Sequence, residues 1–387
     1  MNLTLAKMLD RRLGGLVGRG IGALDRVADG LRRTPGRPDV RHILVTKFWG
    51  LGNWALLRPV VRDLSRRWPA ARITVATFAC NLPLVRDLAD DLLLVRPTSL
   101  GGTVTDLGRA VARLRASPPD LALDFEPFAR SGALLARLGG AGQRLGFHAA
   151  GGGRDGLYTV LVPLRREAHI SRSFRDLAEA AGVAPGPYVA GALEKDAKGD
   201  AEVAALEMSQ GRYVVVHPGS GDNFPGRRWS PAGFAAVGRA AVQHGLEVCV
   251  TGSRAESPLV GEVCRGIGSG ALALPGRLSL RGLIALLDGA AALISNDTGP
   301  VHLASALDVP TLALYGPNTP VLYGPLARHS RAFYRALPCS PCLTAASYRS
   351  SRCRIHVCME SITTGVVTTA LHRLLEARVA EDVGGRS

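Results

Sequence analysis

The sequence contains no run of about 18 apolar residues, the length that a membrane-spanning helix requires. Its start also lacks the compact apolar block of a signal peptide. We therefore expect a cytoplasmic protein. Charged residues make up 20% and hydrophobic residues 47% of the 387 residues. This balance excludes a disordered chain and suffices for two domains with full cores.

Acidic residues are few relative to basic ones. The chain has 32 Asp and Glu against 47 Lys and Arg, which gives a net charge of +15. Such a charge favours an anionic partner: a nucleotide sugar, a phosphorylated glycolipid, a nucleic acid or an acidic membrane surface. No DNA- or RNA-binding motif accompanies the charge, so nucleic acid is not expected as a partner. A GC-rich genome, which enriches arginine, is an alternative explanation.

Residues 1–40 form an extension of their own. Apolar residues such as Leu5, Leu9 and Leu13 recur at helical spacing, with Lys and Arg on the other faces. This pattern is typical of a basic helix that lies on a membrane surface. Five glycines between residues 14 and 22 weaken it. Two roles are equally favoured: peripheral contact with the inner face of the cytoplasmic membrane, and docking on the protein itself or a partner.

From residue 41 the sequence alternates between apolar runs and amphipathic patterns, which is typical of a parallel sheet flanked by helices. Strands are predicted at 42–47, 72–77, 92–95, 120–124, 213–217, 247–251, 271–274, 291–295 and 311–315. A Pro-Gly-Pro sequence interrupts the alternation and marks a connection over 184–205. The pattern predicts an α/β protein with Rossmann-like domains at 41–195 and 206–360, and a helix within 361–387.

The most distinctive segment, residues 293–306, is predicted to be a buried strand, a polar turn and a helix start. The turn and the first helical residues include Asp297, Thr298, Gly299, Pro300 and His302. Thr298 can cap the helix through its hydroxyl, and Pro300 suits the first helical turn. Unpaired N–H groups at a helix start attract anions. The segment can therefore hold a diphosphate beside sugar hydroxyls, although an ordinary capped helix has the same turn chemistry.

Two further glycine-rich turns follow predicted strands. One contains Ser220 and Gly221 and is followed by Arg227; the other is Gly50-Leu51-Gly52-Asn53. Glycine lets the backbone approach a phosphate closely, and arginine can bind phosphate through two hydrogen bonds. Ligands of parallel sheets bind outside the carboxyl ends of the strands, where all three turns fall. The plainer alternative is a strand-to-helix loop with solvated arginines.

Together these segments resemble glycosyltransferase family 9, the bacterial ADP-heptose–lipopolysaccharide heptosyltransferase family. The resemblance covers roughly residues 41–375, and the order and spacing of its motifs make it specific. These motifs are Lys47-Phe48-Trp49-Gly50-Leu51-Gly52-Asn53, Asp124-Phe125-Glu126, His217-Pro218-Gly219-Ser220-Gly221, Arg227-Arg228-Trp229, Asp297-Thr298-Gly299-Pro300-Val301-His302-Leu303-Ala304 and Leu314-Tyr315-Gly316-Pro317. The resemblance implies the GT-B arrangement of two facing Rossmann-like domains, with the acceptor on the first, the donor on the second and the last helix returning to the first.

The implied activity is transfer of a sugar, such as heptose, from a nucleotide diphosphate to a lipopolysaccharide or another cell-surface glycan or lipid-linked acceptor. The acceptor hydroxyl needs a base. In the resembled family the base is usually an Asp at the position of Asn53, which can cap a helix but cannot accept a proton at neutral pH. Three explanations are open: loss of catalysis, a histidine base (His302 or His217), or another carboxylate, namely Asp297, Glu126 or Asp124.

The leaving nucleotide diphosphate needs positive charge and N–H donors. We expect these from the donor-binding set Ser220, Gly221, Arg227, Thr298, Gly299, Pro300 and His302. By resemblance, Asp297 also contacts the donor sugar and Glu256 contacts the nucleoside, where a carboxylate can accept hydrogen bonds from ribose hydroxyls. The alternative for Glu256 is a residue favoured at a helix N-terminus by the helix dipole.

No Asp-x-Asp pair stands in a position suited to a metal, so we expect a metal-independent enzyme without a cofactor. Four cysteines fall within 20 residues, namely Cys339, Cys342, Cys353 and Cys358. Their spacing would allow a structural zinc site. A similar cluster accompanies many family 9 sequences without an implied catalytic metal.

Two rival functions fit the same residues. One is a nucleotide-sugar-binding protein that has lost catalysis at Asn53, and the other is a nucleotide-sugar epimerase or hydrolase on the same architecture. A dehydrogenase is less favoured. Residues 72–77 lack the acidic ribose partner expected about 20 residues after a dinucleotide-binding glycine turn.

Overall fold

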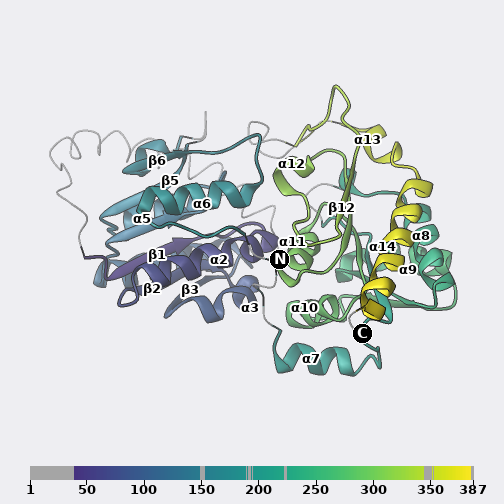
Figure 1. The fold of residues 1–387 in the computed structure, drawn as a ribbon. Coiled ribbons are helices and arrows are strands. Elements are labelled where there is room, and N and C mark those ends of the chain that lie inside the picture. The colour runs from purple at the N-terminus through teal and green to yellow at the C-terminus, as the bar shows by residue number, and fades with distance from the viewer. Residues whose placement is uncertain are drawn as a thin grey trace. The chain divides into compact units, whose positions relative to one another are not determined.

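The computed structural model describes residues 39–148, 153–188, 190, 193, 195–221, 225–343, 351 and 353–384. The chain divides into two compact units, Met1–Tyr188 and Val189–Ser387 (Figure 1). The extension predicted at residues 1–40 lies outside the described residues, apart from Asp39 and Val40. Among the described residues, no helix combines the length and the apolar character needed to cross a membrane.

The first unit is built on a six-stranded parallel sheet with the order β3-β2-β1-β4-β5-β6. Its strands are β1 His42–Thr46, β2 Arg72–Phe78, β3 Asp91–Val95, β4 Leu121–Asp124, β5 Gln143–His148 and β6 Val160–Pro163. Its α-helices are α2 Leu51–Arg67, α3 Leu82–Val85, α4 Leu100–Ala116, α5 Ser131–Leu138 and α6 Ile170–Ala181.

The second unit repeats this architecture, with the strand order β12-β11-β10-β7-β8-β9. Its strands are β7 Tyr213–His217, β8 Glu247–Gly252, β9 Ala271–Pro275, β10 Leu293–Asn296, β11 Thr311–Tyr315 and β12 Arg331–Tyr334. Its α-helices are α7 Ala197–Ala204, α8 Pro231–Gln243, α9 Ser257–Ile267, α10 Leu280–Asp288, α11 Gly299–Leu307, α12 Pro320–Tyr323, α13 Val357–Glu360 and α14 Thr364–Gly384. Two all-parallel sheets confirm the predicted α/β class.

Each sheet reverses its strand order at one point. In the first unit the reversal lies between β1 and β4, where Thr46 is opposite Asp124. In the second unit it lies between β7 and β10, where His217 is opposite Ser295. Ligands of such sheets bind outside the carboxyl ends of the strands at this reversal. The predicted turns therefore occupy the binding edge of each sheet.

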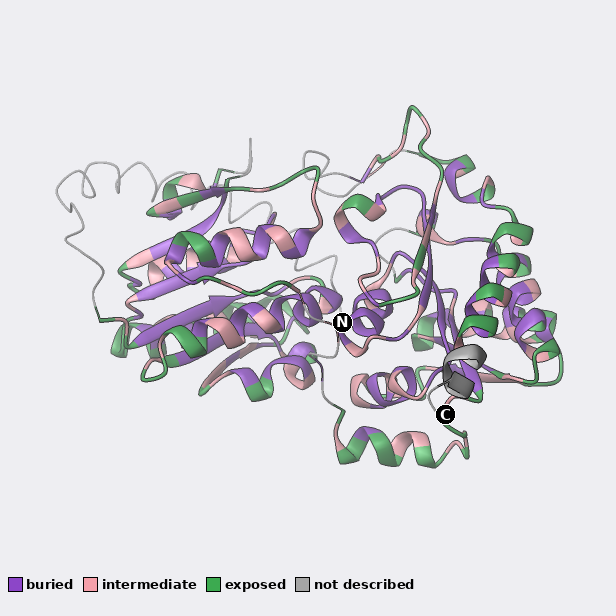
Figure 2. Ribbon diagram, in the orientation of Figure 1, coloured by how far each residue is buried: buried purple, intermediate pink, exposed green. Residues whose placement is uncertain are grey.

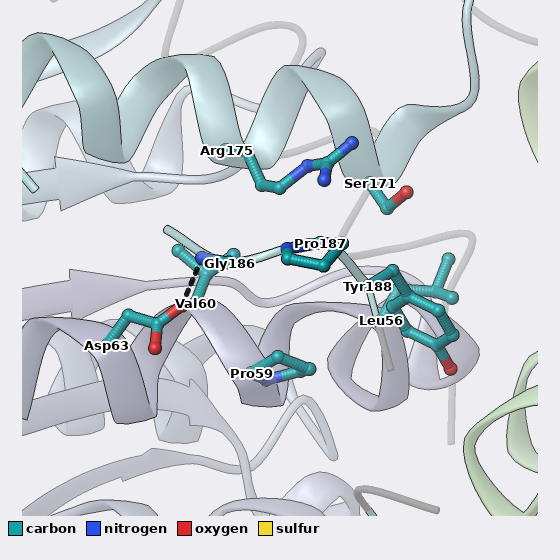
Figure 3. Close-up of a pocket in the computed structure, with 9 residues that line it drawn as sticks. All are labelled: Leu56, Pro59, Val60, Asp63, Ser171, Arg175, Gly186, Pro187 and Tyr188. Atoms are coloured by element: carbon teal, nitrogen blue, oxygen red, sulfur yellow. Dashed lines mark hydrogen bonds between the residues drawn. The ribbon is translucent and has the colours of Figure 1, made fainter. Parts of the chain in front are cut away.

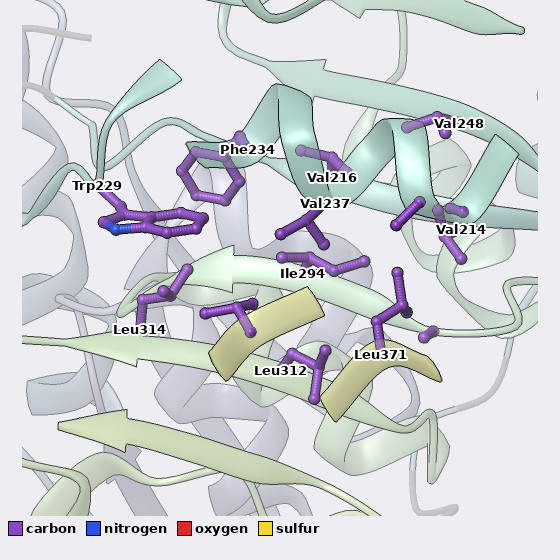
Figure 4. Close-up of a cluster of buried hydrophobic side chains, with 14 of the residues drawn as sticks. Val214, Val216, Trp229, Phe234, Val237, Val248, Ile294, Leu312, Leu314 and Leu371 are labelled. Carbon is purple, nitrogen blue, oxygen red and sulfur yellow. The ribbon is translucent and has the colours of Figure 1, made fainter. Parts of the chain in front are cut away.

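The strands are apolar on both faces because helices cover both sides of a parallel sheet, and most strand residues are buried (Figure 2). In the second unit, Val216 and Ile294 of the sheet pack with Phe234 of α8 and Leu371 of α14 (Figure 4). The indole of Trp229 contacts Phe234 edge to face, with 5.3 Å between the ring centroids. This core fixes the base of the candidate site.

Three strands escaped the sequence-based prediction. They are β5, β6 and β12. β6 and β12 each contain four residues, lie at the outer edge of their sheets and include exposed positions. β5 has polar residues at both of its ends. Short, partly polar strands at or next to an edge carry little periodic signal, because neighbouring strands and not composition decide their pairing.

Two segments belong elsewhere than expected. The predicted connection over 184–205 contains α7, which packs on α10 within the second unit. The resemblance implied that the last helix returns to the first domain, but α14 packs on α8 and contributes Val367 and Leu371 to the core of the second unit. The cause is its apolar face, which completes the cover over that sheet.

Candidate functional site

Asp297 follows β10 at the point where the second sheet reverses. Its side chain is 6% exposed, and its Oδ2 accepts a hydrogen bond of 2.9 Å from Asn318 Nδ2. Arg227 Nη1 lies 3.6 Å from the same oxygen. Among the described residues, none donates a hydrogen bond to Asp297 Oδ1. One oxygen is thus held in place while the other can accept a hydrogen bond from a ligand.

The helix after this turn begins where we predicted, but its cap differs. Thr298 occupies the N-cap position, yet its hydroxyl donates to the carbonyl of Asn296 at 3.2 Å and caps no N–H group. Pro300 lies in the first turn of α11, as predicted. Because the Thr298 side chain does not cap the helix, the positive end of its dipole stays available for an anion.

Arg227 joins two of the predicted turns. Its Nη1 donates to the carbonyl of Asp297 at 2.9 Å, and its Nη2 donates to the carbonyl of Ser220 at 2.8 Å. The side chain is 13% exposed. These contacts place a positive charge at the binding edge between β7 and β10, where a diphosphate was expected.

The turn at Ser220 and Gly221 is organised by Glu256. The N–H groups of both residues donate to Glu256 Oε1, at 3.0 and 3.1 Å. Ser253 donates to Oε2 through its N–H and its hydroxyl, and the Arg228 guanidinium lies 3.3 Å from Oε1. The two N–H groups that we assigned to a diphosphate are therefore engaged by an internal carboxylate.

This network also sets the charge of Glu256. Burial raises its pKa, but the hydrogen bonds from Ser253 and Gly221 lower it more, so the pKa lies below its ordinary value. The side chain is 4% exposed. An ionised and saturated carboxylate of this kind fits a role in holding the turn better than the predicted contact with a ribose.

A cavity of about 160 Å³ opens beside this turn. Its lining residues are His217, Thr251, Gly252, Ser253, Leu274, Leu278, Ser279, Leu280 and Leu283. They come from the carboxyl ends of β7, β8 and β9 and from the start of α10. Apart from His217, sequence reasoning did not find them. The only available signal was the small polar run that ends β8.

His217 is a poor candidate for a general base. Its Nδ1 lies 3.0 Å from the Thr251 hydroxyl, and burial lowers its pKa to about 4. The imidazole is therefore neutral at physiological pH and takes up a proton weakly. His302 lies in the first turn of α11 and is buried, with its ring centroid 6.3 Å from that of Tyr323.

In the first unit, the turn between β1 and α2 is shaped by Gly50. This residue has a φ of 80°, which favours glycine, and it is the N-cap of α2. Asn53 is the third residue of the helix, is buried and donates its N–H to the Gly50 carbonyl at 2.9 Å. The prediction that Asn53 caps the helix is wrong, because the chain already becomes helical at Leu51.

Glu126 lies directly beneath this turn. Its Oε1 accepts the N–H groups of Phe48 and Trp49, at 2.7 and 2.6 Å, and lies 3.2 Å from Lys47 Nζ. The side chain is 2% exposed, so it is not the surface residue that a position after a strand suggests. Among the described residues, none donates to Oε2. The carboxylate is oriented through one oxygen only.

Asp124, by contrast, has both oxygens engaged. Oδ1 accepts hydrogen bonds from the Thr46 hydroxyl at 2.7 Å and from the Glu126 N–H at 3.1 Å, and Oδ2 accepts one from the Tyr158 hydroxyl at 2.6 Å. Burial raises the pKa of Asp124 to about 6, against the opposing effect of Arg154. It is therefore less suited than Glu126 to meet a substrate.

The raised pKa predicts a specific dependence of stability on pH. The folded protein takes up a proton on Asp124 below about pH 6, whereas the unfolded chain does so only below about pH 4. This group therefore stabilises the fold fully below about pH 4, and the contribution of about 3 kcal/mol is lost as the pH rises towards 6. In Asp124→Asn this part of the dependence should be absent. Urea unfolding of both proteins between pH 4 and 8 measures it, and parallel stability curves would contradict it.

Three further residues support the two sites and were missed. Asn296 accepts the Trp229 N–H and donates to the Pro218 carbonyl, and Asn318 holds Asp297. Arg154 is fully buried and donates to the carbonyls of Pro127 and Ala129, among others. A polar residue that ends a buried strand was a signal for Asn296, but nothing in the sequence links Arg154 to a loop 25 residues away.

The cysteine cluster does not form a metal-binding group in the part of the chain that the structure describes. Cys339 and Cys353 are exposed, whereas Cys358 is buried. Burial raises the pKa of the Cys358 thiol. These side chains therefore give no support to a structural zinc site.

A second hollow lies in the first unit, between α2, α6 and residues 186–188 (Figure 3). Ser171 and Arg175 face it from α6, and the Gly186 N–H donates to Asp63 of α2 at 3.3 Å. Its volume is only about 10 Å³, which is space for about one water molecule. It is therefore too small for a substrate.

Known proteins resemble this chain in sequence. The family model described as glycosyltransferase family 9 (heptosyltransferase) matches residues 107–350, more than half of the chain. Lipopolysaccharide heptosyltransferase 1 of Pseudomonas aeruginosa is 35% identical over 152 residues, which are 39% of this chain and 40% of that protein. Lipopolysaccharide heptosyltransferase 2 of Salmonella typhimurium is 25% identical over 308 residues, 76% of this chain and 87% of that protein.

Solved structures show the same fold. The structure of the Escherichia coli ADP-heptose lps heptosyltransferase II has a TM-score of 0.70 at 22% identity and covers 87% of this chain and 99% of its own. A glycosyl transferase family 9 protein from Veillonella parvula has a TM-score of 0.72 at 20% identity, with 87% and 97% covered.

Proposed function

This chain belongs to glycosyltransferase family 9, and we propose that it transfers heptose from ADP-heptose to a lipopolysaccharide acceptor. The names of the relatives support heptose transfer to lipopolysaccharide, and the structurally similar Escherichia coli protein is named for ADP-heptose. The observation that carries the proposal is the arrangement at the edge of the second sheet. There, Arg227 bridges Ser220 and Asp297 beside the start of α11.

The donor occupies the second unit in this proposal. The nucleoside enters the cavity lined by His217 and Leu278, and the diphosphate lies near Arg227 and the N-terminus of α11. Asp297 accepts a hydrogen bond from a sugar hydroxyl through Oδ1. A guanidinium and a helix dipole can stabilise the negative charge that develops on the leaving diphosphate.

The acceptor is held by the first unit. Its hydroxyl attacks the anomeric carbon of the donor, the bond from that carbon to the diphosphate oxygen breaks, and the hydroxyl proton passes to a base. We propose Glu126 as this base, because Oε1 is held by three donors while Oε2 accepts no hydrogen bond from a described residue. The reaction then needs no carboxylate at Asn53 and no metal or other cofactor, since Arg227 supplies positive charge.

The acceptor class also bears on location. A lipid-linked acceptor and a net charge of +15 support peripheral contact with the inner face of the cytoplasmic membrane, through the basic extension at residues 1–40. Co-sedimentation with anionic vesicles, with and without the extension, tests this contact. Equal sedimentation of the two forms would argue against the extension.

The proposed function is tested by calorimetry and product analysis with a panel of nucleotide sugars that includes ADP-heptose, each with and without a lipopolysaccharide acceptor. We expect selective binding of the ADP-linked donor and release of ADP that depends on the acceptor. Binding without turnover would favour a catalytically degenerate binding protein. Breakdown or epimerisation of the donor without an acceptor would favour a hydrolase or epimerase, and no binding of any donor would refute the proposal.

A further inference from the structure

The first helix of the second unit, α7, packs closely on α10 (Figure 1). Two glycines permit the contact. A Cβ atom at Gly199 would lie 2.5 Å from the carbonyl oxygen of Arg281, and one at Gly282 would lie 2.2 Å from Glu202 Oε2. Real Cβ atoms do not approach backbone so closely, so position 199 requires glycine for the helices to meet in this way, whereas a side chain at position 282 would displace the Glu202 carboxylate.

Glu202 uses this contact to bind the start of α10. Its Oε2 accepts the N–H of Ser279 at 2.8 Å, and its Oε1 accepts the Ser279 hydroxyl at 2.5 Å. The Ser279 hydroxyl in turn accepts the N–H of Gly282 at 3.2 Å. The first N–H groups of a helix have no partner within the helix. Glu202 therefore extends the cap of α10 from another helix, with a negative charge at the positive end of the dipole.

Ion pairs also join α10 to the residues at the start of α7. Lys195 Nζ lies 3.1 Å from Asp288 Oδ2 at the far end of α10, and Arg281 pairs with Asp196, the N-cap of α7. The hydrogen bond and charge of Asp288 raise the pKa of Lys195. The start and the end of α10 are thus both tied to α7 and the residues just before it.

The start of α10 forms one wall of the cavity beside His217. Leu278, Ser279, Leu280 and Leu283 all line it. The other lining residues lie at or just after the carboxyl ends of β7, β8 and β9. The α10 wall, by contrast, depends on a side chain from another helix, because Glu202 binds the N–H and hydroxyl groups of Ser279.

We propose that Glu202 is a positioning residue for the nucleoside cavity: it does not touch the ligand but sets the place of the α10 wall. This inference rests on the proposed function, because it takes the cavity as the nucleoside site. Glu202 adds an acceptor for the Ser279 N–H to the N-cap that Ser279 itself supplies, and a capping hydrogen bond is worth roughly a factor of five in an equilibrium constant. A misplaced wall should weaken nucleotide binding by a similar factor and leave the chemical step unchanged.

The test compares Glu202→Ala and Glu202→Gln with Asp200→Asn, a control on the same helix whose side chain lies 3.8 Å from Lys195 and makes no contact with Ser279. Calorimetry with ADP and steady-state kinetics measure the ligand effect. Hydrogen exchange of the amides from 278 to 283, without ligand, measures the wall itself. Urea unfolding of each variant shows whether the fold is intact.

For Glu202→Ala we expect about fivefold faster exchange at 278–283, about fivefold weaker ADP binding and an equal rise in KM for the donor, with kcat unchanged. Glu202→Gln, whose amide oxygen can still accept the Ser279 N–H, should retain most of the binding, and Asp200→Asn all of it.

Unchanged exchange at 278–283 in Glu202→Ala would overturn the inference whether or not ADP binds. Faster exchange without any change in ADP affinity would overturn the assigned role. Failure of the wild type to bind ADP would refute the proposed function, and the exchange result would still decide whether Glu202 positions the wall.

Discussion

Glu126→Gln should reduce sugar transfer about 10³-fold in kcat. A positioned general base contributes roughly 10²- to 10⁴-fold, and an amide cannot accept the acceptor proton. The amide oxygen of Gln can still accept the N–H groups of Phe48 and Trp49 that Glu126 Oε1 binds. The turn before α2 should therefore keep its shape while the basic oxygen is lost. Initial rates at saturating donor and acceptor measure the effect.

The buried charge of Lys47 complicates this variant, because it loses its carboxylate partner. A double variant, Glu126→Gln with Asn53→Asp, separates the two effects. It returns a carboxylate to the same turn at the position where the resembled family usually has its base, but it does not restore the ion pair. We expect it to recover at least tenfold of the lost rate. Full activity in Glu126→Gln, or no recovery in the double variant when both are folded, would place the base elsewhere.

Asp297→Asn should lower kcat/KM for the nucleotide sugar about 100-fold. A hydrogen bond to a charged group contributes about 1.5 to 3 kcal/mol, and each 1.4 kcal/mol corresponds to a factor of ten. The Asn side chain can still accept the hydrogen bond from Asn318 that holds Asp297 Oδ2. The local geometry should persist, while the charge-assisted contact from Oδ1 to the sugar is lost.

The contact with the sugar can be separated from the rest of the donor site by using two ligands. ADP lacks the sugar that is transferred. Its affinity should therefore change less than threefold in Asp297→Asn, whereas the affinity for the ADP-linked donor should fall. Asp308→Asn is a matched control, because Asp308 pairs with Arg328 on the surface of the same unit. An equal loss of affinity for ADP and for the ADP-linked donor would show that Asp297 contacts the nucleotide or stabilises the fold, and does not bind the transferred sugar.

Local sequence patterns were enough to place the binding edges. Buried parallel strands have nearly continuous apolar runs, and glycine-rich turns mark where such strands end. Both signals involve neighbours in the sequence, so the strands before Gly50, Ser220 and Asp297 were predicted to within two residues. Once the sheets are parallel, all of these ends must fall on one edge of each sheet.

The role of each polar side chain at those edges could not be predicted in the same way. Glu256 was expected to meet a ribose, but it binds two N–H groups of a turn that lies about 35 residues earlier. The sequence shows Glu126 only as a residue that follows a strand, yet its carboxylate lies beneath a turn 77 residues away. A carboxylate accepts whichever donors the fold brings within 3 Å, and no periodic pattern records that distance.

The sequence by itself determined the α/β class, the family and the two edges at which ligands bind, because these depend on local apolar periodicity and on turn residues. Only the tertiary structure decided which carboxylates keep an oxygen available. Asp124 and Glu256 are saturated by hydrogen bonds, whereas Asp297 and Glu126 each keep one oxygen that no described residue engages. The physical reason is that hydrogen-bond satisfaction depends on contacts between residues far apart in the chain.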